Sequence, residues 1–72
     1  MALFIISYNT IQRNERLIGP INGLRKVENE IKRLFQKNNY LDEIRVYKAE
    51  LRSDGTYDGV GYPILYQRRG NN

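Results

Sequence analysis

The chain opens with an apolar run that is hydrophobic on both faces of the strand it predicts. Residues 2–8 read ALFIISY. Strand side chains alternate between two faces, so Leu3 and Ile5 point one way while Phe4, Ile6 and Tyr8 point the other. A strand with one wet face alternates apolar and polar residues, whereas a near-continuous apolar run is typical of a strand covered on both faces. We therefore expect this strand to need cover on both sides.

A helical pattern follows, beginning at Leu24 and running to Lys37. Apolar residues recur at the spacing of one helix face, at Leu24, Val27, Ile31, Leu34 and Phe35. Asn22 is the expected N-cap residue, because its side chain can accept a hydrogen bond from an unpaired backbone N–H. Asn38 and Asn39 are expected to end the helix. One helix covers one face, so the other face of the first strand is expected to meet a second copy or a ligand.

Two further strands and a loop complete the predicted elements. Residues 9–22 are mostly polar, carry Arg13 and Arg16, and are interrupted by Gly19-Pro20, which predicts a connecting loop. Residues 43–52 and roughly 60–68 predict two strands joined by a turn at Asp54-Gly55. Proline cannot donate a ladder hydrogen bond, so Pro63 predicts an edge strand or a bulge. Residues 70–72 are expected to form a frayed tail.

The predicted fold is α+β: a single domain over residues 1–72, with a single helix packed on one face of a three-stranded β-α-β-β sheet. A right-handed crossover makes the first two strands parallel. Five apolar side chains are expected to face the helix: Leu3, Ile5, Ile44, Val46 and Leu65. The open face then collects Phe4, Ile6, Tyr8, Arg45, Tyr47, Tyr62, Ile64 and Tyr66. This assignment depends on strand register, because a slip by one residue inverts it.

Composition narrows the class of protein. The 72 residues carry twelve Lys and Arg against eight Asp and Glu, a net charge of +4, with no Cys and no His. The absence of Cys and His excludes the usual zinc, copper and iron–sulfur sites, so no metal and no cofactor are expected. The opening run is too short for a membrane span and lacks the features of a signal peptide, which predicts a soluble cytoplasmic protein. The positive charge favours an anionic partner, nucleic acid first, although some basic proteins have none.

The catalytic inventory is thin, and we expect a protein that is not an enzyme. Ser7 and Ser53 have no candidate base beside them, and the Asp residues fall at turn positions, where they are common for backbone reasons. A magnesium-dependent nuclease that uses two carboxylates and Lys48 is a minor alternative. Residues 54–59 partly match a calcium loop but lack its further acidic ligands. The frequency of Ile, Asn and Tyr is of the kind found in AT-rich genomes, including those of phages.

Base stacking is the chemistry that the chain does offer. Aromatic rings on an open sheet rimmed by arginine hold single-stranded bases, at about 1–3 kcal/mol per base. The predicted nucleic-acid-binding residues are Phe4, Arg45, Tyr47, Tyr62, Tyr66, Arg68 and Arg69. Residues 3–6 (LFII) and 59–62 (GVGY) are similar to the first-strand motif and to the start of the third-strand motif of the RNA recognition motif, with Phe4 and Tyr62 at stacking positions. The resemblance implies the first half of that family's fold, in β-α-β-β order, and it implies RNA binding. The third-strand motif departs from the family's pattern at Asp58, Val60 and Pro63.

Association is the alternative use of the same face. A homodimer would enlarge a small core, and its predicted interface is Phe4, Ile6, Tyr8 and Ile64. Tyrosine and arginine are also enriched in protein interfaces, so the pattern does not separate these uses. The leading prediction is a nucleic-acid-binding homodimer. The alternative is a protein-binding modulator or inhibitor that docks on a larger complex, and the choice between RNA and DNA stays open.

Overall fold

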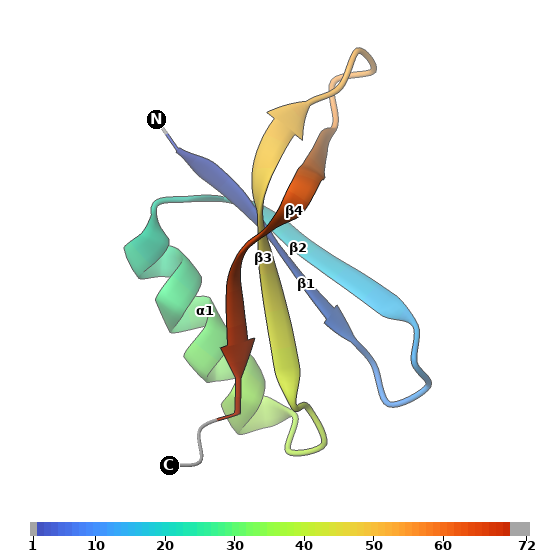
Figure 1. Ribbon diagram of the computed structural model, residues 1–72, viewed down its shortest axis with the longest axis vertical. Coiled ribbons are helices and arrows are strands. Elements are labelled where there is room, and N and C mark those ends of the chain that lie inside the picture. Colours follow the sequence, from blue (N-terminus) through green and yellow to red (C-terminus); the bar gives the residue numbers. More distant parts are fainter. Residues whose placement is uncertain (1, 70–72) are drawn as a thin grey trace.

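One helix packs on a four-stranded antiparallel sheet in the computed structural model, which describes residues 2–69 (Figure 1). The elements are β1 (Leu3–Asn9), β2 (Glu15–Asn22), α1 (Leu24–Lys37), β3 (Glu43–Leu51) and β4 (Tyr57–Arg68). The strand order is β2-β1-β3-β4. The α+β class and the helix bounds are confirmed. The expected tail at residues 70–72 lies outside the described residues. No helix in residues 2–69 is long and apolar enough to cross a membrane.

The prediction of three strands is wrong, because the segment expected to be a loop forms β2. This strand is an edge strand and most of its side chains are exposed, so it lacks the apolar alternation of a half-buried strand. A bulge further interrupts its pattern: Phe4 pairs with Ile21 and Ile6 pairs with Ile18, which leaves Gly19 and Pro20 opposite Ile5. An irregular edge strand of this kind carries little sequence signal.

The extra strand also reverses the predicted direction of pairing. β1 and β3 are antiparallel, not parallel. β2 returns the chain to the end of the sheet where β1 began, and α1 then carries it back to the end where β1 finished (Figure 1). β3 therefore starts beside the end of β1 and runs against it. β2 and β3 run in the same direction but are not neighbours, because β1 lies between them.

The predicted facing of β1 is wrong for the same reason. The antiparallel register pairs Ile6 with Val46, and paired residues share a face. The core beneath α1 consists of Phe4, Ile6, Val27, Ile31, Leu34, Leu41, Ile44 and Val46, with Tyr8 and Leu65 packed against it. Phe4 and Ile6 are therefore buried inside the chain and do not lie on the open face. The predicted helix-facing positions Ile44, Val46 and Leu65 are confirmed.

The opposite side of β1 is also covered from within the chain. Ile5 points away from the helix, yet it is only 4% exposed. Gly19 and Tyr47 contribute to this cover: a Cβ atom on Gly19 would lie 3.0 Å from Ile5 Cδ1, and Tyr47 pairs with Ile5. The expectation that the second face of this strand needs an outside partner is therefore wrong for β1 itself.

Both prolines lie in edge strands beside bulges. β2 contains Pro20, which follows a cis peptide bond, and β4 contains Pro63. The bulge in β4 falls between the pairs Val46–Leu65 and Lys48–Val60, so residues 61–64 lie opposite Tyr47 alone. The edge position and the bulge predicted from Pro63 are both confirmed.

The ends of α1 differ in part from the prediction. The N-cap residue is Gly23, not Asn22, and no side chain caps this end. Asn38 is the C-cap residue as expected, but its φ of −124° is not left-handed. Its Nδ2 instead donates a hydrogen bond of 3.0 Å to the carbonyl oxygen of Leu34. The predicted Asp54-Gly55 turn is confirmed, with Gly55 at a φ of 89°.

Candidate nucleic-acid interface

The open face of the sheet, on the side away from α1, carries several of the side chains predicted to bind nucleic acid. Arg45 pairs with Tyr66, and Tyr47 pairs with Ile5, in positions that alternate with core residues of β3. Tyr66 is 54% exposed. Arg68 pairs with Glu43 on the same side, so two tyrosines and two arginines of the predicted site share this face.

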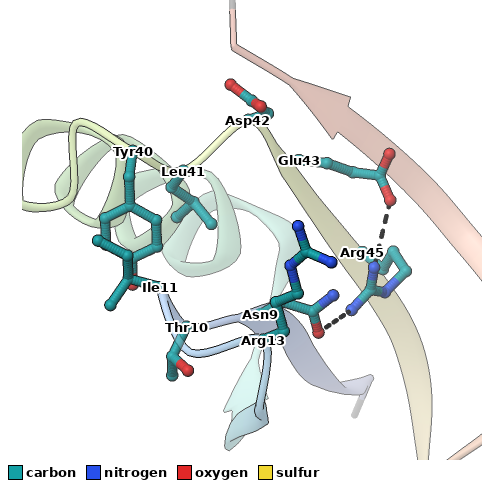
Figure 2. Close-up of a pocket in the computed structure, with 9 residues that line it drawn as sticks. All are labelled: Asn9, Thr10, Ile11, Arg13, Tyr40, Leu41, Asp42, Glu43 and Arg45. Carbon is teal, nitrogen blue, oxygen red and sulfur yellow. Dashed lines mark hydrogen bonds and ion pairs between the residues drawn. The ribbon is translucent and has the colours of Figure 1, made fainter.

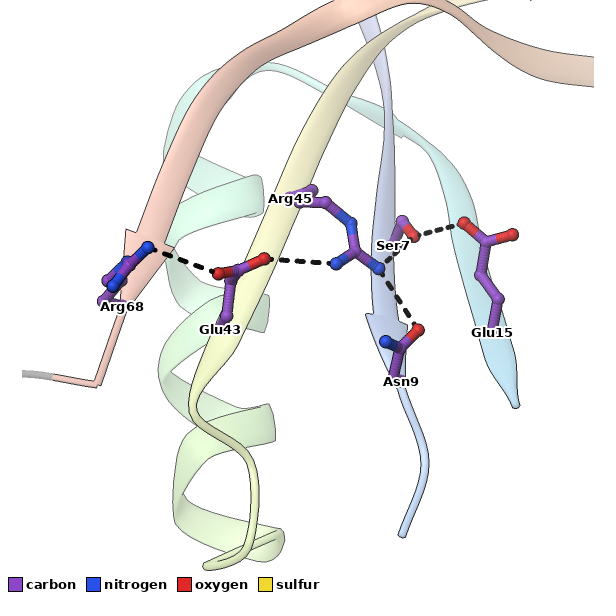
Figure 3. Close-up of polar contacts among 6 residues, drawn as sticks. All are labelled: Ser7, Asn9, Glu15, Glu43, Arg45 and Arg68. Carbon is purple, nitrogen blue, oxygen red and sulfur yellow. Dashed lines mark hydrogen bonds and ion pairs between the residues drawn. The ribbon is translucent and has the colours of Figure 1, made fainter. Parts of the chain in front are cut away.

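A row of polar side chains crosses all four strands at one end of this face (Figure 3). We call it the polar ladder; its members are Glu15, Ser7, Asn9, Arg45, Glu43 and Arg68. Ser7 Oγ donates to Glu15 Oε2 at 2.7 Å and accepts from Arg45 Nη2 at 3.1 Å. Arg45 Nη1 donates to Glu43 Oε2 at 3.2 Å. The ladder ends at Arg68, whose Nη2 lies 3.8 Å from Glu43 Oε1.

The polar ladder makes the open face electrically balanced. Its two arginines are matched by two glutamates, so its net charge is zero. Arg45 is mostly buried among its partners, with 18% of its side chain exposed. Glu15 and Glu43 would also repel a phosphate that approached this row. Among residues 2–69, the predicted arginines Arg45 and Arg68 lie on this face, but acids of the ladder match their charge.

The other half of the open face is a shallow groove. Its volume is about 240 Å³, and its lining consists of Ile5, Glu15, Leu17, Tyr47, Asp58 and Gly59. A Cβ atom on Gly59 would lie 2.8 Å from Tyr47 Cβ, so glycine lets the tyrosine pack against β4. Asp58 pairs with Arg52, with Asp58 Oδ2 and Arg52 Nη2 2.6 Å apart. Both acids of the groove are thus engaged, Glu15 in the polar ladder and Asp58 with Arg52, so the groove offers apolar surface and no excess of positive charge.

A second hollow lies between two loops at the end of the sheet (Figure 2). Its volume is about 500 Å³, and it is lined by Asn9, Thr10, Ile11, Arg13, Tyr40, Leu41, Asp42, Glu43 and Arg45. Arg13 has a φ of 69°, an uncommon conformation for a residue other than glycine. Two arginines and two acidic residues line the hollow, so it too is balanced in charge. It therefore shows no preference for an anion.

The positive charge of the chain is concentrated on α1. At 100° per residue, seven positions form the side of the helix that points away from the sheet, and all seven are exposed. We call them the outer stripe; they are Arg25, Lys26, Asn29, Lys32, Arg33, Gln36 and Lys37. Five are cations, two are amides and none is acidic. Both glutamates of the helix lie on its flanks, so α1 carries three of the four net positive charges of the chain.

One of the flanking glutamates is paired with the outer stripe. Arg33 Nε donates to Glu30 Oε1 at 3.2 Å, and Arg33 Nη2 contacts the other carboxylate oxygen. These hydrogen bonds lower the pKa of Glu30 and raise the pKa of Arg33. Arg33 is thus matched by one acid, whereas the other four cations of the stripe form no ion pair with an acid among residues 2–69.

The N-terminal turn of α1 has an unfavourable charge for its position. It contains Arg25 and Lys26, has no acidic residue, and has no side-chain cap. The N-terminus of a helix carries partial positive charge, so each cation there costs about 0.3–1 kcal/mol at low salt. A sequence selected for helix stability alone would place acids in this turn.

The remaining predicted site residues are separated from one another. Phe4 and Ile6 are core residues, Tyr8 packs against the core, and Ile64 on β4 is exposed. Tyr62 is 91% exposed at the bulge, so the two stacking positions implied by the RNA recognition motif, Phe4 and Tyr62, are not available together.

Arg69 has a structural position that the sequence did not reveal. Its Nε donates to the carbonyl oxygen of Leu41 at 2.8 Å, and its Nη2 donates to the carbonyl oxygens of Phe35 and Asn38 at 3.1 and 2.7 Å. Its guanidinium carbon lies 5.0 Å from the centre of the Phe35 ring. Arg69 therefore ties the end of β4 to the end of α1, and it is turned away from the open face.

Comparison with known proteins adds no assignment: no family model, no curated protein and no solved structure matches this chain. Function must therefore be argued from the charges and surfaces described above.

Proposed function

We propose that this protein binds nucleic acid without catalysis, and that the outer stripe of α1 is the contact surface. The observation that carries the proposal is the composition of the stripe: five cations and two amides at seven exposed positions, with no acid among them. Lysine and arginine contact phosphates, and Asn and Gln side chains donate and accept hydrogen bonds to phosphates, sugars and base edges.

The dimensions of the stripe suit a polyanion. Residues 25 and 37 are twelve positions apart, which is about 18 Å along the helix axis. Duplex nucleic acid carries one phosphate charge per about 1.7 Å of its axis, so a stripe of this length faces several phosphates. A bound phosphate near Arg25 and Lys26 would also reverse the unfavourable charge of the first helical turn.

The proposal moves the predicted contact from the sheet to the helix. Tyr47 and Tyr66 lie on the open face of the sheet, where the charges of the polar ladder sum to zero. The excess positive charge lies on α1, on the opposite side of the sheet. Attraction to phosphate is the largest sequence-independent contribution to nucleic-acid binding, so the basic surface is favoured over the aromatic one.

The test compares two variants of equal charge. In the helix variant, Lys26, Lys32 and Lys37 are changed to Gln. In the control variant, Arg13, Arg16 and Arg52 are changed to Gln; these are three cations outside α1 and outside the polar ladder. Both variants have a net charge of +1, so the overall electrostatic attraction between protein and nucleic acid falls equally in the two. Binding to a fluorescent single strand and to a duplex is measured by anisotropy over a salt series.

The helix variant should bind roughly 10- to 100-fold more weakly than the wild type, with a salt slope smaller by about one to three. The control variant should lose much less affinity. Equal losses in the two variants would refute the assignment to α1. A wild-type protein that binds neither oligonucleotide at about 50 mM salt would refute nucleic-acid binding altogether, and recovery of one stoichiometric protein partner would then favour a modulator docking on a larger complex.

A further inference from the structure

Exposed apolar side chains collect on the open face and on the edge strand beside it. Six large ones are Leu17, Leu51, Tyr57, Tyr62, Ile64 and Tyr66, and four of these belong to β4. A tyrosine side chain offers about 150–250 Å² when fully exposed and a leucine or isoleucine somewhat less, so the exposed fractions of the six amount to roughly 500–600 Å². One partner in a standard protein interface contributes about 800 Å². This apolar area is thus close to what one side of a stable dimer needs.

The edges of the sheet are less suited to association than its face. β2 and β4 are the two edge strands, and each contains a proline and a bulge. Proline removes a ladder donor and a bulge breaks the regular spacing, and both features oppose edge-to-edge pairing of strands. A partner is therefore expected to stack on the open face.

The charges at the two ends of the polar ladder are complementary to each other. The ladder ends in an exposed arginine on β4, Arg68, and in an exposed glutamate on β2, Glu15. Consider a two-fold axis that lies parallel to the strands, between two copies stacked face to face. This axis places β4 of one copy over β2 of the other. Each arginine end of the ladder then lies over a glutamate end, and the ladders together carry no net charge.

We propose that a second copy of this chain covers the open face, in a two-fold homodimer with Ile64 and Tyr66 in the apolar part of the interface. The occupant is a second copy because one surface supplies both the apolar area and the two complementary charges. The outer stripes of α1 lie on the far sides of both copies and stay exposed. The dimer does not depend on nucleic-acid binding, and it is tested in the absence of nucleic acid.

The first test measures mass by sedimentation equilibrium over a range of protein concentrations. The wild type should reach twice the 8.5 kDa mass of the chain. Ile64→Glu should shift the dissociation constant upward by at least tenfold, because two copies of the charge enter one interface. Ile11→Glu is the matched control: Ile11 is also exposed, at 68%, but it lies in the loop after β1. Helical circular dichroism verifies that both variants fold.

The second test uses the ladder ends. Glu15→Arg and Arg68→Glu should each weaken the dimer when measured alone, because like charges then face each other twice. An equimolar mixture of the two variants should associate more tightly than either alone, since every Arg then faces a Glu. A wild type that stays monomeric at all concentrations would refute the dimer. A dimer that is unaffected by Ile64→Glu, or a mixture no tighter than its components, would refute this face or this orientation.

Discussion

Replacing Arg69 by alanine should destabilise the protein far more than the same change at its neighbour Arg68. The sequence presents two adjacent arginines with no visible difference. In the structure Arg68 is 78% exposed and has one long ion pair, whereas Arg69 bonds to three main-chain carbonyl oxygens at the end of α1 and the loop that follows it. The pair is therefore a matched test of position at constant composition and charge.

The magnitude follows from the contacts that are lost. Each hydrogen bond from the guanidinium to a carbonyl oxygen contributes about 1 kcal/mol net, because the carbonyl regains water when the arginine is removed. The contact with the Phe35 ring adds about 0.5 kcal/mol. Arg69→Ala should thus lower the free energy of unfolding by about 3–4 kcal/mol, and the melting temperature by roughly 12–32 °C for a chain of this size. Arg68→Ala should change the free energy of unfolding by about 0.5 kcal/mol or less.

Urea and thermal unfolding, followed by circular dichroism at the helix band, measure both variants at one protein concentration, chosen low enough for the chain to be monomeric. Arg69→Lys gives a further comparison, since an ammonium group cannot reach three carbonyls in the fork geometry of a guanidinium and should recover only part of the loss. If Arg69→Ala and Arg68→Ala unfold within about 0.5 kcal/mol of each other, the role assigned to the Arg69 contacts is wrong.

Three further substitutions test other parts of the fold. Gly19→Ala should destabilise by about 2 kcal/mol in urea unfolding, because Gly19 has a φ of 140° and an added Cβ atom would lie 2.7 Å from the Phe4 carbonyl oxygen. Ser7→Ala should destabilise by about 1–2 kcal/mol in the same assay, because its buried hydroxyl connects two members of the polar ladder. Hydrogen bonds from the Thr56 hydroxyl and backbone N–H lower the pKa of Asp54 in the folded protein. The ionised Asp54 therefore stabilises the fold above its unfolded-state pKa, and this stabilisation is lost as the pH falls through its folded-state pKa. Asp54→Asn should flatten the pH dependence of the unfolding midpoint between about pH 5 and pH 2.

Each of these results has a clear contrary outcome. A Gly19→Ala protein as stable as the wild type would mean that β2 adopts another backbone path. If Ser7→Ala is as stable as the wild type, the Ser7 hydroxyl contributes nothing to the free energy of unfolding. If Asp54→Asn leaves the pH dependence of the unfolding midpoint unchanged, a group other than Asp54 causes the loss of stability in acid.

Local pattern was sufficient for the elements whose signal is strong and regular. The apolar spacing of Val27, Ile31 and Leu34 predicted α1 and its buried face, since helix periodicity needs no information from distant residues. The Asp54-Gly55 turn and the bulged edge at Pro63 were predictable because glycine and proline restrict the local backbone. β2 was missed because its bulge and exposure remove the alternation on which strand prediction depends.

The candidate site was harder to predict than the fold. The sequence alone determined a small basic α+β protein, with a first strand apolar on both sides and one amphipathic helix. Only the tertiary structure decided which way those residues face. An unseen strand reversed the pairing of β1 with β3, and this placed Phe4 and Ile6 under the helix. It also balanced the charges of the sheet face and left the helix as the basic surface, because register and pairing depend on residues far apart in the chain.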